Sequence, residues 1–252
     1  MKMLRGQFRL LRAGLVTLAL YSTWLAGHAV LFASPAARAR WRRAVMRRWC
    51  AALCRAFAIR VTVVGEPPSA GALVVSNHLS YLDIPVLGSC LSTAFVSKAE
   101  IARWPVIGAL ARQFDTVFLV RERKRELPAV NDAIAGAIER GLGVVLFPEG
   151  TSTRGAEVLA FRPSLLAPAA ERGLAVRAAS ISYRTQAGDP PASLKVCWWG
   201  DMEFVPHVRE MVLLDGIEAR VEFAPEPVCD TDRKRLAEKL QALVKSRFRP
   251  VP

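Results

Sequence analysis

From about residue 60 onward, apolar runs of strand length alternate with segments whose apolar residues recur at helical spacing. Strands are predicted at residues 59–65, 71–76, 94–98, 115–121, 143–147, 175–183, 194–200 and 217–223. Helices are predicted from residue 83 and at 104–114, 127–139, 158–172 (broken) and 232–248. This alternation predicts an α/β fold, with a mixed, largely parallel sheet flanked by helices. Functional residues in such sheets gather in loops at strand ends.

The first 60 residues differ from the rest in charge. They contain twelve Lys or Arg and no Asp or Glu, whereas the other 192 residues hold 23 basic and 22 acidic side chains. The net charge of +13 therefore belongs to the N-terminal segment. Residues 13–33 carry no formal charge over 21 positions, which is long enough to cross a bilayer. We expect residues 1–60 to form a membrane-anchoring helical hairpin and residues 61–252 to form the α/β domain.

Basic residues flank the uncharged run on both sides. Because such residues usually stay on the cytoplasmic side, a single span would place one cluster wrongly, and a hairpin dipping into one leaflet would not. Residues 41–57 support the hairpin, since they read as a basic, amphipathic, interfacial helix. The alternative is a cleaved signal peptide, which fits poorly because the mature protein would start with an acid-free, Arg-rich segment.

Two further classes of site find little support. The five cysteines are odd in number, form no CxxC motif and cluster with no histidine. We therefore expect them to be reduced thiols that pack in the core, and we expect no metal site. The positive charge coincides with the apolar run and forms no basic face elsewhere. It therefore favours a membrane over a nucleic acid as partner.

The segment "SNHLSYLDIP" places His78 directly after a strand and Asp83 at a helix start. A tight turn between them can bring the two side chains together. An aspartate bonded to one imidazole nitrogen fixes the tautomer and leaves the other nitrogen free as a base. The alternative is a plain turn in which Asp83 caps the helix.

Two other loops carry candidate residues. "FPEGTS" follows an apolar strand, and Gly150 would let a ligand approach the backbone beside Glu149 and Thr151. Arg121 ends the strand in "VFLVRER", where a guanidinium could bind phosphate. Taken alone, each has a plain alternative, a solvated glutamate for the first loop and a surface arginine for the second.

Together the three loops resemble the glycerolipid acyltransferases, the family of the 1-acylglycerol-3-phosphate acyltransferases. The resemblance covers most of residues 60–230 through "NHLSYLD", "KAEIARWPVIG", "VFLVRE" and "FPEGTSTRG". The N-terminal module is also similar to that of bacterial members. This likeness implies a position on the cytoplasmic face of a bacterial inner membrane.

The resemblance implies an enzyme in which His78 is the general base and Asp83 its orienting partner. A fatty acyl chain would move from acyl-CoA or acyl carrier protein to the free hydroxyl of a lysophospholipid, with no metal or other cofactor. The first expected acceptor is 1-acyl-sn-glycerol-3-phosphate, giving phosphatidic acid. Asn77 would fix the turn. The acceptor headgroup would be bound by Arg121, Glu149, Gly150 and Thr151, with added positive charge from Lys98.

Some positions depart from the family pattern. Phosphatidate-forming members commonly have arginine where Ser152 stands, and Arg154 is a candidate replacement. Alanine at 178 or 179 stands where proline is expected. "EGTS" and "CWWGDMEFVPH" are similar to the branch that acylates lyso-ornithine lipid, which is therefore the alternative acceptor. A catalytically silent membrane-binding protein on the same fold is the non-enzyme alternative, and intact His78, Asp83 and Glu149 argue against it.

Overall fold

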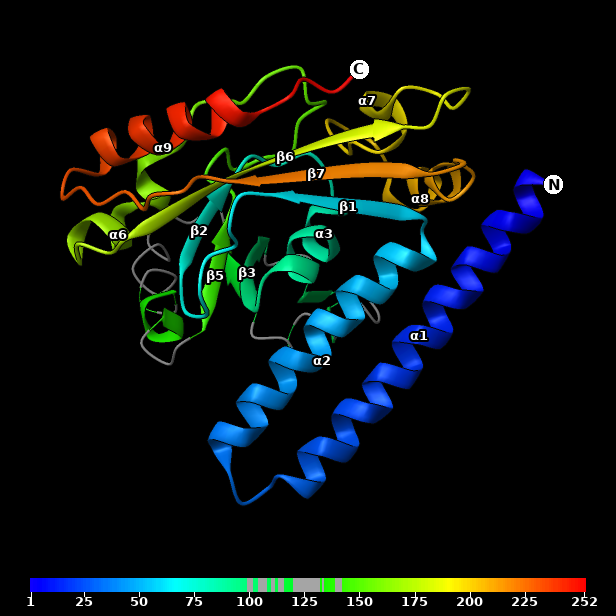
Figure 1. Cartoon of the computed structure of the whole chain (residues 1–252), viewed down its shortest axis with the longest axis horizontal. Coiled ribbons are helices and arrows are strands. Elements are labelled where there is room, and N and C mark those ends of the chain that lie inside the picture. Colours follow the sequence, from blue (N-terminus) through cyan, green and yellow to red (C-terminus); the bar gives the residue numbers. More distant parts are fainter. Residues whose placement is uncertain are drawn as a thin grey trace.

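The computed structural model describes residues 1–98, 102–103, 108–109, 112, 116–119, 132, 134–138 and 142–252. It begins with two long helices, α1 (Lys2–Val30) and α2 (Pro35–Ala56), joined by a short turn. Ser34 ends that turn, and its hydroxyl accepts a hydrogen bond from the backbone N–H of Ala37, while Pro35 occupies the first helical position. The turn lies at the far end of the helix pair from the sheet (Figure 1).

Seven strands of the described chain form one sheet, in the order β1-β7-β6-β2-β5-β3-β4. Their bounds are β1 Ile59–Val64, β2 Leu73–Ser76, β3 Thr93–Lys98, β4 Val117–Leu119, β5 Gly143–Leu146, β6 Val176–Thr185 and β7 Ile217–Phe223. Only the β6–β7 pair is antiparallel, and the other described pairs are parallel. The predicted mixed, largely parallel sheet is confirmed. Strands β2 and β5 are buried at every position, as expected for strands covered on both faces.

Helices cover both faces of the sheet. The shorter ones are α3 (Asp83–Cys90), α6 (Ala167–Glu171), α7 (Ala192–Lys195) and α8 (Phe204–Met211), with a 3-10 turn η3 at Pro163–Leu165. Helix α9 (Arg233–Arg247) packs on one face through Leu236, Leu240 and Val244. On the other face, α2 and α3 share a core cluster that includes Cys50 and Val86. The two layers are visible on either side of the sheet in Figure 1.

One predicted strand is wrong. Residues 194–200 do not form a strand, because the N–H groups of Val196 and Cys197 bond to the carbonyl of Ala192 and close a helical turn. The apolar pattern there arises from burial of these two side chains in the core, away from any sheet partner. Helix α2, predicted as an interfacial helix, also contributes side chains to the α/β fold. Met46, Cys50 and Cys54 pack into the core of the α/β fold.

Helix α1 runs along α2 but leaves most of its apolar side chains exposed. The Nε1–H of Trp49 donates to the Thr17 hydroxyl, and the Trp41 indole lies where a side chain on Gly27 would stand. Glycine at position 27 therefore permits close approach of the two helices. Among the described helices, α1 alone is long and apolar enough to cross a membrane, judged by length and composition.

The N-terminal end of α1 is bonded to the α/β fold. Arg9 is 7 % exposed, and its guanidinium donates to the carbonyls of Val212, Leu214 and Asp215, just beyond α8. Arg5 donates to the carbonyl of Leu213 and forms an ion pair with Asp215. Two of the four basic residues that precede the uncharged run thus satisfy carbonyls just beyond α8.

Candidate active site

The turn between β2 and α3 brings His78 and Asp83 together. The Nδ1 of His78 lies 2.7 Å from Oδ2 of Asp83. Because a carboxylate accepts, Nδ1 carries the proton and Nε2 keeps a free lone pair. The His78 side chain is 20 % exposed while that of Asp83 is fully buried, so the pair presents one basic nitrogen at the surface of the fold. The expected helix start at Asp83 is confirmed.

Asp83 is held by more than the histidine. Its Oδ2 also accepts the backbone N–H groups of Leu79 at 2.7 Å and Ser80 at 3.1 Å. Its Oδ1 accepts the Tyr183 hydroxyl at 2.7 Å, across the sheet from β6. A buried carboxylate needs such donors, and these fix its orientation toward His78.

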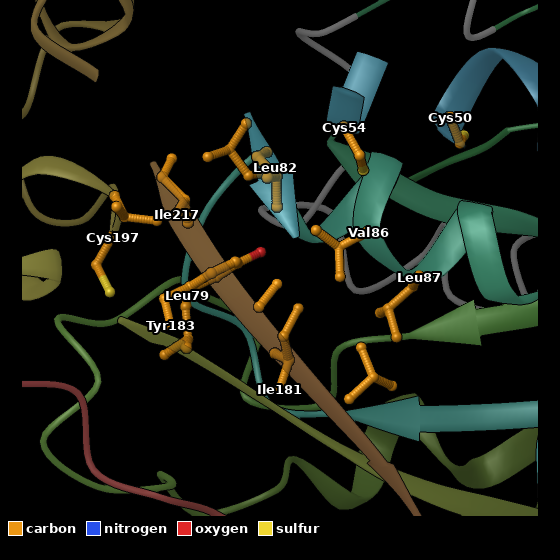
Figure 2. Packing of buried hydrophobic residues seen from close by; sticks show 14 of the residues in the cluster. Cys50, Cys54, Leu79, Leu82, Val86, Leu87, Ile181, Tyr183, Cys197 and Ile217 are labelled. Atoms are coloured by element: carbon orange, nitrogen blue, oxygen red, sulfur yellow. The ribbon is translucent and has the colours of Figure 1, made fainter. Parts of the chain in front are cut away.

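Hydrophobic side chains anchor the same turn in the core. Leu79 and Leu82 lie between the two polar residues, are 1 % exposed and point inward (Figure 2). They join the cluster that contains Ile181, Tyr183 and Ile217. The chain therefore alternates between apolar anchors and polar functional groups, and the turn has little freedom to change shape.

The loop after β5 meets this turn because β2 and β5 are paired in parallel. The ring of Phe147 stacks on the imidazole of His78, with centroids 4.2 Å apart and planes at 18°. The backbone N–H of Thr153 donates to the carbonyl of His78 at 3.0 Å. Two of the three predicted loops are thus brought together.

Glu149 lies buried in this loop, at 2 % exposed. Burial, and then the nearby carboxylate of Asp83, raise the pKa of Glu149 to about 8. The backbone N–H groups of His78 and Leu159 offset only part of this rise. Neither of these N–H groups makes a hydrogen bond of normal geometry to the Glu149 carboxyl group. Both carboxyl oxygens therefore lack a hydrogen-bond partner among the described residues. A buried carboxyl group with two unsatisfied oxygens is a candidate for contact with a polar substrate.

Gly150 has a φ of 72°, which favours glycine, and it also makes room for an arginine. A Cβ at this position would stand 2.7 Å from Nε and 2.9 Å from Cζ of Arg162. The backbone N–H of Arg162 donates to the carbonyl of Pro148, and its side chain is exposed. Arg162 was not predicted as a site residue, because it lies eleven residues beyond the "FPEGT" motif in a segment predicted as a broken helix.

The other predicted site residues are placed as follows. Asn77 is buried, and its amide donates to and accepts from the backbone of Ile181, contacts that agree with its expected role of fixing the turn. Thr151 and Arg154 are exposed beside the turn. Lys98 ends β3, but its side chain lies outside the described residues, as does all of Arg121.

This arrangement can remove a proton from a hydroxyl group. The imidazole is oriented by a buried carboxylate, and the adjoining loop holds a second, buried carboxyl group and has the Arg162 guanidinium over Gly150. In the described part of the chain, no three His, Cys, Asp or Glu side chains gather where they could hold a metal ion. The fold and the site define a transferase or hydrolase of the general-base class.

Comparisons with known proteins narrow this class. A family model described as Acyltransferase matches residues 60–182. A lyso-ornithine lipid O-acyltransferase of Pseudomonas aeruginosa is 35 % identical over 205 residues, which cover 81 % of this chain and 78 % of the relative. The chain belongs to the acyltransferase family, and it is an enzyme of lipid metabolism.

Two further relatives are more distant. A 1-acyl-sn-glycerol-3-phosphate acyltransferase of Neisseria meningitidis is 28 % identical over 185 residues, covering 70 % of this chain and 69 % of that protein. The crystal structure of the 1-acyl-sn-glycerophosphate acyltransferase of Thermotoga maritima aligns with a TM-score of 0.62 at 22 % identity, covering 95 % of both chains. This last match confirms the fold.

Proposed function

We propose that the protein transfers a fatty acyl chain from a thioester to the free hydroxyl of a lysolipid. The observation that carries the proposal is the buried Asp83 bonded to Nδ1 of His78, which leaves Nε2 as a base on the exposed side. Nε2 takes the hydroxyl proton while the oxygen attacks the thioester carbonyl. The thiolate leaves and receives that proton, so the products are an ester and a free thiol. Such base assistance contributes roughly 10²–10⁴ in rate.

Two lysolipids are candidates for the acyl acceptor. Similarity to the lyso-ornithine lipid O-acyltransferase is higher than to the 1-acyl-sn-glycerol-3-phosphate acyltransferase, at 35 % against 28 % identity. Ser152 also replaces the arginine that is common in phosphatidate-forming enzymes. We therefore place lyso-ornithine lipid first as acceptor, and 1-acyl-sn-glycerol-3-phosphate second because the second relative and the matching fold support it.

The turn after β5 suits either headgroup at one point. Arg162 lies over Gly150 and offers a guanidinium to a phosphate or to the carboxylate of ornithine. Glu149, with both oxygens unsatisfied, would accept from an ammonium or a hydroxyl group. An ornithine headgroup carries both a carboxylate and an ammonium group, and so would use both residues.

A panel assay tests this function. The purified full chain is given one acyl donor and separate lysolipid acceptors: lyso-ornithine lipid, 1-acyl-sn-glycerol-3-phosphate and an uncharged monoacylglycerol. We expect the highest kcat/KM with lyso-ornithine lipid. A higher kcat/KM with the phosphate acceptor would reverse the order of the two candidates, and no transfer to any lysolipid would contradict the proposed function. Replacing acyl-CoA by acyl carrier protein as donor distinguishes the carrier.

The two N-terminal helices are proposed to anchor the enzyme on the cytoplasmic face without crossing the membrane. Helix α1 exposes a series of large apolar side chains, among them Leu4, Phe8, Leu11, Leu15 and Leu18. If α1 crossed the bilayer, its N-terminal end would lie on the opposite side from the α/β fold. The bonds of Arg9 to residues 212–215 favour a place on the same side, which supports the proposed anchor.

Accessibility of engineered cysteines tests the anchor. Cysteines placed at Met3 and Arg40, in a background without Cys229, are labelled in intact cells with a membrane-impermeant maleimide. We expect both sites to be protected until the inner membrane is opened. Labelling of either one in intact cells would show a periplasmic site and contradict the anchor.

A further inference from the structure

Tyr81 lies at the centre of the turn that carries His78 and Asp83, and its hydroxyl is bonded outside that turn. It lies 3.0 Å from Nδ1 of His207, on helix α8, 126 residues further along the chain. The other ring nitrogen, Nε2, lies 3.1 Å from the carbonyl of Cys197. Since a carbonyl only accepts, Nε2 carries the proton, and Nδ1 accepts the Tyr81 O–H.

His207 is suited to this role because it is buried, at 6 % exposed. Burial lowers the pKa of His207, and a neutral imidazole has one donor and one acceptor nitrogen. Each nitrogen is used once, so His207 has no free atom for substrate. Through these two side-chain hydrogen bonds, His207 links the turn to the segment between β6 and β7.

The same segment contacts the turn at other points. The backbone N–H of Trp198 donates to the carbonyl of Leu79 at 2.8 Å. The Tyr81 ring meets the rings of Phe204 and Trp198 edge-on, with centroids 4.9 Å and 6.0 Å away. These contacts are separate from those of Asp83, which bonds the backbone N–H groups of Leu79 and Ser80. The turn is thus held twice, by Asp83 and by residues 197–207.

We propose that His207 is a positioning residue for the base: by holding Tyr81, it fixes the turn that aims His78 at the acceptor hydroxyl. The proposal rests on the proposed function of His78. It assigns a task to the segment "CWWGDMEFVPH", for which the sequence indicated only a likeness to one branch of the family. It also explains why a histidine is buried outside the site.

The test uses four variants of the full chain: His207→Ala, His207→Gln, Tyr81→Phe, and His207→Ala combined with Tyr81→Phe. Arg209→Ala, exposed on the same helix, is the control. We expect His207→Ala and Tyr81→Phe each to lower kcat by about tenfold, with the KM values for acceptor and donor changed less than about twofold, because only the aim of the base is lost. The double variant should be no slower than the slower single variant, since both changes break one interaction.

His207→Gln distinguishes positioning from bulk packing. Its amide oxygen can accept from Tyr81 and its amide nitrogen can donate to Cys197, so we expect kcat to return to within about threefold of wild type. Tyr81→Phe removes only the hydroxyl oxygen and leaves the packing of the ring in place. A wild-type kcat in this variant would therefore overturn the proposal. Losses that multiply in the double variant, or no recovery in His207→Gln when it melts like wild type, would also overturn it.

A parallel His78→Ala variant separates this proposal from the proposed function. If His78→Ala is inactive while Tyr81→Phe keeps full kcat, only the positioning role of His207 fails. If His78→Ala keeps its activity, the base assignment fails, and the positioning role fails with it.

Discussion

The imidazole ring of His78 lies flat on the phenyl ring of Phe147, with 4.2 Å between centroids. The two residues are 69 positions apart in sequence and belong to turns after adjacent parallel strands. The stack limits rotation of the imidazole about its Cβ–Cγ bond, and the hydrogen bond from Nδ1 to Asp83 limits its tilt. Both contacts together leave Nε2 with one direction in which to act.

Replacing Phe147 tests the contribution of the stack. Phe147→Leu keeps an apolar side chain but removes the flat surface, and aromatic pairs contribute about 0.5–1.5 kcal/mol beyond burial. We expect kcat to fall about three- to tenfold, with acceptor KM little changed. Steady-state kinetics of the purified variant measure both. An unchanged kcat would show that the bond to Asp83 alone orients the base.

Glu149 makes the stability of the free enzyme depend on pH. Its pKa is about 8 in the folded protein and has its ordinary value of 4.5 in the unfolded chain. Between these values the folded protein holds a proton that the unfolded chain has released, so stability falls as pH rises from about 4.5 to about 8. Glu149→Gln removes this dependence, and we expect it to be more stable than wild type by on the order of 2–4 kcal/mol at pH 8.

Urea unfolding of both proteins at pH 5 and pH 8 measures this difference in free energy. It should be small at pH 5 and large at pH 8, while activity of the variant is lost if Glu149 contacts substrate. Equal differences at the two pH values would mean that Glu149 is ionised and satisfied in the folded protein.

Replacing Arg162 or Arg154 tests which arginine binds the acceptor headgroup. Arg162→Ala removes the guanidinium that lies over Gly150. We expect the acceptor KM to rise about tenfold, which corresponds to about 1.4 kcal/mol of binding free energy, while the donor KM stays constant. Arg154→Ala should give the same pattern only if Arg154 replaces the arginine missing at position 152. Unchanged acceptor KM in both variants would leave Arg121 as the untested cation of the predicted pocket.

Arg9 is expected to stabilise the fold from within the first helix. Arg9→Ala removes donors to the backbone carbonyls of Val212, Leu214 and Asp215, the first two of which belong to buried residues. Hydrogen bonds to charged groups contribute about 1.5–3 kcal/mol, so we expect a loss of about 2–3 kcal/mol in unfolding free energy. Thermal unfolding in detergent, with exposed Arg12→Ala as the matched control, measures it. Equal melting of the two variants would show that the docking of α1 contributes little.

The sheet was predictable from the sequence because each strand is a short apolar run followed by a turn or helix signal, as at "GALVVSNH". The pairing of His78 with Asp83 followed from a strand end and a helix start only five residues apart. Contacts between distant segments were not predictable. Arg162 over Gly150 and His207 on Tyr81 each depend on which loops the sheet order brings together. The error at residues 194–200 arose because burial of Val196 and Cys197 has the same apolar pattern in a strand and in a turn.

The assignment of Nε2 of His78 as the base can be checked by single-turnover acyl transfer in His78→Ala, with saturating donor and acceptor. Asp83→Asn serves as a second variant, since an amide in place of the carboxylate no longer fixes the tautomer. Circular dichroism and vesicle binding verify that both variants fold and bind membranes. If Nε2 is the base, the His78→Ala rate falls at least about 100-fold, and the Asp83→Asn rate falls nearly as far. A folded His78→Ala that retains more than about a tenth of the wild-type rate would contradict it.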